Sequence, residues 1–371
     1  MLRDDPVLAI SRSDRNGVAA VEKQLASQPT FTRLLDLLSR QQHLEALEFA
    51  PLRLAGKRLR NMNGGQRPQT LTLDIDGLPL PVHGEQAGSA YNGHTRSRIH
   101  YPLIATCAET GDMLAGLLRP GNAGPAAEAD IWIPRLVEQA ERHLCHKAQV
   151  RLDAGFTDGK TLAALDAHGI GYIGRLKNNP ALERLFEPYK YRRPGRHAEK
   201  PREWLVDTSY QAKSWSHRRR VLIVVREEPH KLFRDCFLIT NLPHPPTRLL
   251  ALYRRRGKAE GHMGEYKNVI GDSLPTTSRG KASDATVLAR SQALLSTRLL
   301  AYELLHVLRT VLEKQTRQGW SLRRLRESVL KTASRVQSSG RRLIVVLART
   351  ATGFWTLLTR SLSRMSAYNT S

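Results

Sequence analysis

Residues 71–77 read Leu-Thr-Leu-Asp-Ile-Asp-Gly, and the fold class follows from this short segment. Apolar and polar residues alternate strictly, which is the period of a β-strand that buries one face. Gly77 and then Pro79 end the alternation. The pattern therefore predicts a half-buried strand that carries Asp74 and Asp76 on one face, close to its carboxyl end.

Further strand and helix patterns follow on the C-terminal side. Strands are expected over residues 99–107 and 113–118, joined by the turn 109–112, which makes a three-stranded meander. The chain then alternates helix, strand, helix and strand over residues 131–140, 150–153, 162–167 and 170–174. Asp153 ends the first of these later strands. This order predicts a mixed sheet that includes parallel strands.

Five regions are expected along the chain. Residues 67–180 should form the first part of an α/β domain, a mixed sheet flanked by helices, and residues 249–285 a helix that completes its core. Basic and strand-like runs over residues 181–248 predict a β-rich insertion. The N-terminal region 1–66 and the C-terminal region 286–371 show mostly helical spacing.

Four polar residues fall on one face of the helix expected to start near Leu249. With 100° per residue, an arc of about 60° contains Tyr253, Arg256, Glu260 and Lys267. This polar stripe borders an apolar one, so Glu260 would lie at the edge of the core. Three glycines in the same segment, Gly257, Gly261 and Gly264, leave room for close approach. Each of them costs about 1 kcal/mol relative to alanine inside a helix.

Carboxylates at two strand ends and on one helix are typical of a divalent-metal site. Mg²⁺ prefers hard oxygen ligands in octahedral geometry, so a few carboxylates from separate elements are enough to bind it. Two such ions about 4 Å apart activate a hydroxyl nucleophile and stabilise the leaving oxygen of a phosphodiester. The candidate ligands for two Mg²⁺ or Mn²⁺ ions are Asp76 or Asp74 on the first strand, Asp153 and Glu260. Arg256 and Lys267 would neutralise the neighbouring phosphates.

The composition favours a nucleic-acid partner over a membrane. The 371 residues contain 58 Lys and Arg against 34 Asp and Glu, a net charge of +24, and the pI is near 10.5. Such a surplus indicates a polyanionic partner.

The apolar run 343–348 is too short to cross a bilayer and residues 1–20 lack the apolar segment of a signal peptide, so a cytoplasmic location is expected. The widely spaced cysteines argue against disulfides and against a zinc knuckle.

These motifs resemble those of the DDE transposases of bacterial insertion sequences, in the group that has a Tyr-x2-Arg-x3-Glu-x6-Lys signature. All spacings of that signature are reproduced by Tyr253, Arg256, Glu260 and Lys267. Residues 73–77 and 151–156 are similar to the segments that carry the family's first and second catalytic Asp. Asp76 is preferred as the first because a small residue and a turn follow it directly, and Asp74 on the same face is the alternative.

The resemblance implies an RNase-H-like fold in which a β-rich insertion separates the second Asp from the Glu. It implies metal-dependent DNA cleavage at element ends and strand transfer into target DNA by Asp76, Asp153 and Glu260. The implied partners are the terminal inverted repeats and target DNA, with a homodimer assembled on DNA. Relatives usually have a longer N-terminal region that recognises the element ends. Residues 1–66 are therefore expected to be a truncated end-binding region.

The resemblance also implies that Tyr253, Arg256 and Lys267 bind DNA. The structural alternative is a solvated helix face, with Glu260 and Arg256 in an i, i+4 ion pair worth about 0.5 kcal/mol. His83, His94 and His100 match no zinc spacing and are expected to be ordinary surface or strand residues. Two other functions stay open, namely a DNA endonuclease of the same fold without strand transfer and a DNA-binding remnant that has lost catalysis.

Overall fold

The computed structural model describes residues 28–190, 200–228, 234–274, 283–339 and 342–367. Residues 1–27, part of the expected end-binding region, therefore lie outside the described residues. The chain divides into two compact units, a first one with the residues up to Leu47 and from Gly264 onward, and a second one with Glu48–Met263. No described helix is long and apolar enough to cross a membrane.

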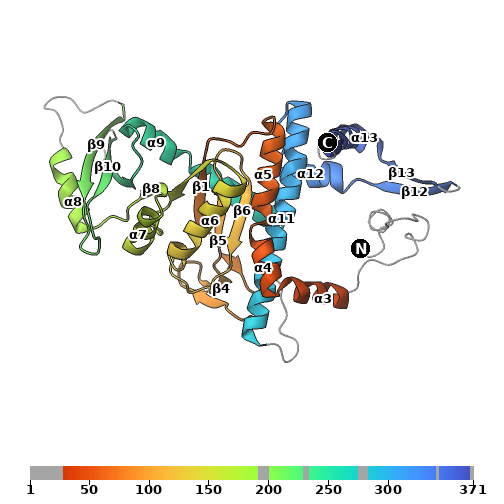
Figure 1. The fold of residues 1–371 in the computed structure, drawn as a ribbon, viewed down its shortest axis with the longest axis horizontal. Helices are drawn as coiled ribbons and strands as arrows, with labels where there is room; N and C mark the ends of the chain where they lie inside the picture. Colours follow the sequence, from red (N-terminus) through yellow and green to blue (C-terminus); the bar gives the residue numbers. More distant parts are fainter. Residues whose placement is uncertain (1–27, 191–199, 229–233, 275–282, 340–341, 368–371) are drawn as a thin grey trace. The chain divides into compact units, whose positions relative to one another are not determined.

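A mixed sheet of eight strands forms the centre of the second unit (Figure 1). Its strands are β1 (Thr70–Gly77), β5 (Leu103–Cys107), β6 (Met113–Leu117), β7 (Lys147–Leu152), β8 (Gly171–Arg175), β9 (Arg202–Tyr210), β10 (Arg219–Glu227) and β11 (Arg234–Thr240). Their order is β6-β5-β1-β7-β8-β11-β10-β9. β1 pairs antiparallel with β5 and parallel with β7, and β7 pairs parallel with β8. The predicted fold class, an RNase-H-like mixed sheet flanked by helices, is confirmed.

The alternating pattern of β1 places its apolar side chains on one face, as predicted, but the strand is not half-buried, because Thr72 and Asp74 on the other face are also buried. Leu71, Leu73 and Ile75 are buried in the large apolar core on one face. Asp74 and Asp76 occupy the other face, because successive side chains of a strand point to opposite sides. The predicted strand 99–107 is divided in two by Tyr101 and Pro102, since proline cannot donate to a ladder. Its first half, β4 (Ser97–His100), instead joins β2 (Leu80–Pro81) and β3 (Ala90–Asn92) in a small sheet.

The strands of the 181–248 region continue the main sheet. β11 pairs antiparallel with β8, with Ile239 opposite Gly174. β10 then pairs with β11, and β9 with β10, both antiparallel. The segment that interrupts the α/β pattern in the sequence is thus part of one sheet in space.

Helices cover both faces of this sheet. One face packs against α5 (Ala50–Met62), α6 (Ala129–His143), α7 (Gly159–Ala167) and α8 (Pro180–Phe186). The opposite face carries Ile173, Leu222 and Leu238, which pack against Leu249 and Leu250 of α9. α9 spans Pro246–Arg254. α9 therefore lies on the same side of the sheet as the strand carboxylates.

The prediction of a single helix from Leu249 onward is wrong. α9 ends at Arg254, and a new helix, α10, spans Gly257–Val269. Between them the amides of Arg256 and Ala259 bond to carbonyls three residues earlier, a tighter turn that interrupts the α-helical ladder. Gly257, a poor helix former, stands at this break. The helical wheel drawn across it therefore does not describe the side-chain directions.

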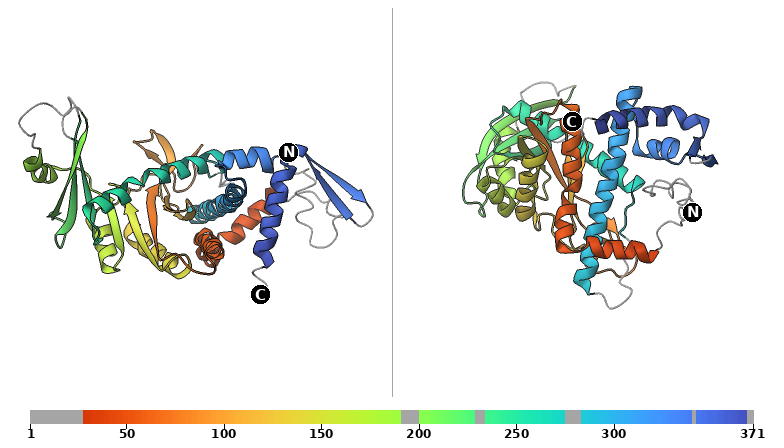
Figure 2. Two further views of the ribbon diagram at one scale, coloured as in Figure 1. Left: turned by 90° about the horizontal axis from the view of Figure 1, so that it is seen from above. Right: turned by 45° about the vertical axis from the view of Figure 1, so that its right-hand side comes forward.

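The first unit is mainly helical. It contains α3 (Gln28–Leu38), most of α4 (Gln41–Glu48), the end of α10, α11 (Asp284–Thr316), α12 (Leu322–Leu325), a π-helical turn (Arg326–Leu330) and α13 (Arg349–Ala367). Trp320 packs edge-on against Phe354 of α13, with ring centroids 5.0 Å apart. Figure 2 shows the long helix α11 of this unit.

The helical C-terminal region also contains a hairpin that the sequence analysis did not expect. Its strands are β12 (Ser334–Ser339) and β13 (Arg342–Leu347). β13 contains the β-branched run Ile344, Val345 and Val346, which suits a strand better than a helix. A short apolar run of this length fits either element by periodicity alone.

Candidate active site

The sheet brings Asp76 and Asp153 together at the carboxyl ends of two neighbouring strands. Ile75 of β1 lies opposite Leu152 of β7 in parallel register, and each carboxylate residue follows directly. Burial raises the pKa of Asp76, Arg256 opposes this rise, and the negative charge of Asp153 adds to it. Two carboxylates thus lie close enough to repel each other, as ligands of a shared cation do before the cation binds.

Asp74 has a different environment although it shares a strand face with Asp76. Its two oxygens accept hydrogen bonds from Nε and Nη2 of Arg151, at 2.5 and 2.7 Å. Both side chains are fully buried. Arg151 also donates from Nη1 to the carbonyl oxygen of Leu252, at 2.5 Å. Both oxygens of Asp74 are therefore bonded to Arg151, and Arg151 joins the sheet to α9.

Arg256 connects Asp76 with Glu260. Its Nη2 donates to Oδ2 of Asp76 at 2.7 Å, and its Nη1 lies 3.7 Å from Oε1 of Glu260. The Arg256 side chain is 11% exposed, that of Asp76 22%, and that of Glu260 71%. Burial lowers the pKa of Arg256, but Asp76 and Asp153 outweigh burial and the net shift is upward. The guanidinium is thus held by carboxylates inside the candidate site.

Glu260 lies near the beginning of α10 and reaches the strand carboxylates only through Arg256. The i, i+4 ion pair between Arg256 and Glu260, which belonged to the structural alternative, is present. The predicted position of Glu260 at the edge of the core is wrong, because its side chain is largely exposed. The break before α10 explains this difference, since it rotates Glu260 away from the stripe drawn on one continuous helix.

Tyr253 and Lys267, the other residues of the signature, differ in position. Burial raises the pKa of Tyr253 to about 12, and Asp153 adds to the rise, so this phenol of α9 lies near the carboxylate pair. Lys267 belongs to the first unit, whereas the pair belongs to the second, and the structure does not place the two together. Burial lowers the pKa of Lys267, and Asp272 opposes the shift.

Tyr101 is a site residue that sequence reasoning missed. Burial raises the pKa of its phenol, and the charges of Asp76 and Asp153 raise it further, while Arg119 opposes them. A Cβ atom added at Gly77 would lie 2.4 Å from the Tyr101 ring, so the ring passes directly over the turn after Asp76. The glycine after Asp76 was the one available signal, because it allows such an approach.

The carboxylate pair suits a divalent cation, but a complete set of three ligands is not assembled. Carboxylate oxygens are the ligands that Mg²⁺ and Mn²⁺ take, and Asp76 and Asp153 present them at one edge of the sheet. Across the described residues, no three His, Cys, Asp or Glu side chains are grouped as metal ligands. The guanidinium of Arg256 lies between Asp76 and Glu260 instead. The histidines singled out in the sequence join no such group either.

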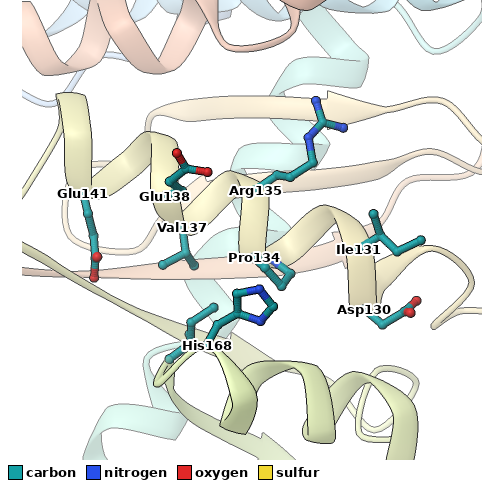
Figure 3. Close-up of a pocket in the computed structure, with 9 residues that line it drawn as sticks. Asp130, Ile131, Pro134, Arg135, Val137, Glu138, Glu141 and His168 are labelled. Carbon is teal, nitrogen blue, oxygen red and sulfur yellow. The ribbon is translucent and has the colours of Figure 1, made fainter.

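An open pocket lies elsewhere in the second unit, between α6 and the end of α7 (Figure 3). Apolar Ile131 and Pro134 and acidic Glu138 line it together with His168. The ring of His168 already bonds the carbonyl of Ala164 at 2.8 Å. None of the candidate active-site residues lines this pocket, so it is separate from the carboxylate pair.

Comparisons with known proteins point to one family. The family described as "Transposase DDE domain group 1" matches residues 1–368. Among solved structures, the chain is similar to the piggyBac transposase in a synaptic complex with hairpin DNA, at 10% identity and a TM-score of 0.41. The match covers 69% of this chain and 50% of that protein, so the chain spans about half its length. No curated protein matches the chain significantly.

Proposed function

Because the chain belongs to the family of group 1 transposase DDE domains, we propose that it cleaves DNA at the ends of its element and joins the freed 3′ hydroxyl to target DNA. The observation that carries the proposal is the pairing of Asp76 and Asp153 at adjacent ends of parallel strands. Transposition by this family is DNA chemistry at phosphodiesters, for which such a carboxylate pair is suited.

Asp76, Asp153 and Glu260 are the proposed ligands of two Mg²⁺ or Mn²⁺ ions. When bound, the ions would lower the pKa of the attacking hydroxyl and stabilise charge on the leaving oxygen. The carboxylates orient the reacting phosphate by fixing where cations bind. Asp76 rather than Asp74 has this role, because Asp74 is buried and bonded to Arg151 through both oxygens.

Three residues of the signature are proposed to hold DNA. The guanidinium fork of Arg256 matches two phosphate oxygens, and the ammonium group of Lys267 provides a point charge. Tyr253 has a hydroxyl close to Asp153 that can donate to a phosphate oxygen. The surplus of +24 charges supports a polyanionic partner.

Several finer assignments belong to this proposal. They are the bacterial group with the Tyr-x2-Arg-x3-Glu-x6-Lys signature, terminal inverted repeats and target DNA as substrates, a homodimer assembled on DNA, and the cytoplasm as the location. We also propose the five functional regions 1–66, 67–180, 181–248, 249–285 and 286–371, with end recognition by the first.

One assay separates the proposed function from its alternatives. Purified protein would be mixed with Mg²⁺, a supercoiled target plasmid and a linear donor that carries the inverted repeats found beside the gene. Covalent joining of donor 3′ ends to the plasmid supports the transposase. Nicking without joining supports an endonuclease of the same fold. DNA binding without cleavage in Mg²⁺ or Mn²⁺ supports the inactive remnant.

A further inference from the structure

We infer that Arg256 is an exchangeable counter-cation, which neutralises Asp76 in the free protein and leaves it when a divalent ion binds the carboxylate pair. This inference rests on the proposed function, because it takes Asp76 and Asp153 as ion ligands. It goes further by assigning Arg256 two successive partners, first the carboxylate and then a DNA phosphate. Ion binding and DNA binding are therefore coupled through one side chain.

The guanidinium of Arg256 lies between carboxylate oxygens that a divalent ion would use. Its Nη2 lies 2.7 Å from Oδ2 of Asp76, and its Nη1 3.7 Å from Oε1 of Glu260. A cation between these oxygens reduces the repulsion among nearby carboxylates. A divalent ion that bound the same oxygens would carry a higher charge into the same place, and the two cations would repel each other. The guanidinium must then move away from Asp76.

Arg256 has fewer side-chain hydrogen bonds than Arg151, which lies two residues before Asp153. Arg151 uses Nε and Nη2 on Asp74 and Nη1 on the carbonyl of Leu252, and it is fully buried. Among the described residues, the Arg256 side chain donates one hydrogen bond, to one oxygen of Asp76, and its buried Nε donates none. The other oxygen of Asp76 accepts from its neighbour's backbone amide, that of Gly77, at 2.8 Å. All three guanidinium nitrogens of Arg151 thus donate hydrogen bonds, whereas only Nη2 of Arg256 donates one to a described residue.

The backbone around Arg256 is not part of a regular helix. The residue lies in the break between α9 and α10, outside both helical ladders. Gly257 follows it, and Gly261 lies one turn further on. Apart from the adjoining backbone of the segment itself, no described atom lies within 4 Å of the place where a Cβ of either glycine would be. Glycines without packed neighbours allow the segment to turn at little cost. The release of Arg256 therefore does not require the core to rearrange.

A consequence is that the free protein is prevented from binding DNA fully at this point. While Arg256 bonds to Asp76, its fork is not available for a phosphate. Ion binding frees the fork, and DNA that holds the fork away from Asp76 strengthens ion binding by the same factor, because coupling is reciprocal.

Mn²⁺ binding to the free protein tests the exchange without any measurement of activity. The free Mn²⁺ signal in electron paramagnetic resonance would be titrated with wild type, Arg256→Gln and Arg254→Gln. Arg254 is the matched control, because it is an exposed arginine two residues away that pairs with Glu203. We expect Arg256→Gln to bind Mn²⁺ about fivefold or more tightly than wild type, within the usual range of coupling, and Arg254→Gln to resemble wild type.

The outcomes separate this inference from the proposed function. If wild type binds Mn²⁺ and Arg256→Gln binds it no better, the exchange is refuted and the metal site stands. If neither protein binds Mn²⁺ at millimolar concentration, both are refuted. If Arg254→Gln gains as much as Arg256→Gln, the effect is general charge removal, and the exchange is again refuted.

Chemical labelling gives a second measurement on the folded wild-type protein. Phenylglyoxal would be added with and without Ca²⁺ alone, and the adducts at Arg256 and Arg254 would be quantified by mass spectrometry. We expect Ca²⁺ to increase labelling of Arg256 several-fold while Arg254 stays constant. Asp76→Asn should raise Arg256 labelling without Ca²⁺ and abolish the response to it. Equal labelling of Arg256 in both conditions would overturn the inference.

Discussion

Arg151 of β7 lies opposite Asp74 of β1 in parallel register, and two hydrogen bonds join their side chains inside the sheet. Two residues further along each chain segment come Asp76 and Asp153, on the same side of the sheet. A buried ion pair therefore lies directly beneath the candidate active site. The two levels have different tasks, because the lower one holds α9 to the sheet and the upper one faces solvent.

The buried pair predicts a large loss of stability when one partner is removed. Asp74→Ala would leave the Arg151 guanidinium buried without its carboxylate, so the free energy of unfolding should fall by about 3–5 kcal/mol. Urea unfolding measures this change. Asp207→Ala is the control, because it removes an exposed carboxylate paired with Arg220 on the same sheet and should cost less than about 1 kcal/mol. Equal effects of the two variants would show that Asp74 is not a structural residue.

Substitution of the three proposed metal ligands should reduce the cleavage rate, whereas substitution of Asp74 should reduce stability. Asp76→Asn, Asp153→Asn and Glu260→Gln should each lower the cleavage rate by about three orders of magnitude or more, because metal ligands act as a unit. The urea unfolding curves of Asp153→Asn and Glu260→Gln should stay close to that of the wild type. The measurement is nicking of a supercoiled plasmid in Mg²⁺, with Asp207→Asn as the control. An Asp76→Asn protein that cleaves normally would remove Asp76 from the site.

The shifted pKa of Asp76 predicts how stability depends on pH. Burial, the leading cause, raises this pKa above its ordinary value of 3.8, so the folded protein holds the proton more tightly than the unfolded chain. Stability contributed by this group is present at pH below 3.8 and is lost as the pH rises through the folded pKa. Asp76→Asn stays neutral throughout. Its free energy of unfolding relative to wild type should therefore increase between pH 3 and pH 7, and a constant or decreasing difference would contradict the shift.

The contact between Gly77 and Tyr101 predicts a mutation whose effect depends on its neighbour. In Gly77→Ala the new methyl group would lie 2.4 Å from the ring, so the ring must move, at a cost of about 1–3 kcal/mol. In the Tyr101→Ala background the same substitution should cost much less. A double-mutant cycle in urea gives the coupling energy. Additive effects would show that the ring does not lie over Gly77.

DNA affinity should depend on salt through the two cations of the signature. Each phosphate contact adds about −0.9 to the slope of log K against log salt. Arg256→Ala and Lys267→Ala should therefore each flatten the slope by about one, as measured by fluorescence anisotropy on a duplex in saturating Ca²⁺. An unchanged slope would mean that the cation only pairs with protein carboxylates.

Much of the sheet, and the place of Asp76 and Asp153 at its strand ends, could be predicted from the sequence. Strict alternation before Gly77 and a strand that ends at Asp153 are local signals, and local signals determine where a strand ends. Asp76 was preferred over Asp74 only because of the glycine that follows it. The bond of Asp74 to Arg151 of another strand is a tertiary contact and could not be predicted. Tyr101 was missed for the same reason.

The side-chain directions predicted by the helical wheel are wrong beyond the break between α9 and α10. It assumed a constant 100° per residue from Tyr253 to Lys267, whereas the chain tightens at Arg256 and starts a new helix at Gly257. Glycine content warned of weakness in the helix but not of the position of a break. The hairpin β12–β13 was missed because a six-residue apolar run has no period that separates strand from helix.

The pairing of β11 with β8 has a consequence for the integrity of the molecule. β8 is a short apolar strand, and without residues 200–240 its backbone donors and acceptors would form an open sheet edge, a template for aggregation. The outermost strand of the natural sheet, β9, carries Arg202, Glu203 and Asp207, charges that discourage pairing with a second chain. The inserted strands thus protect the catalytic sheet from self-association, and shortening the protein to its minimal α/β part would remove that protection.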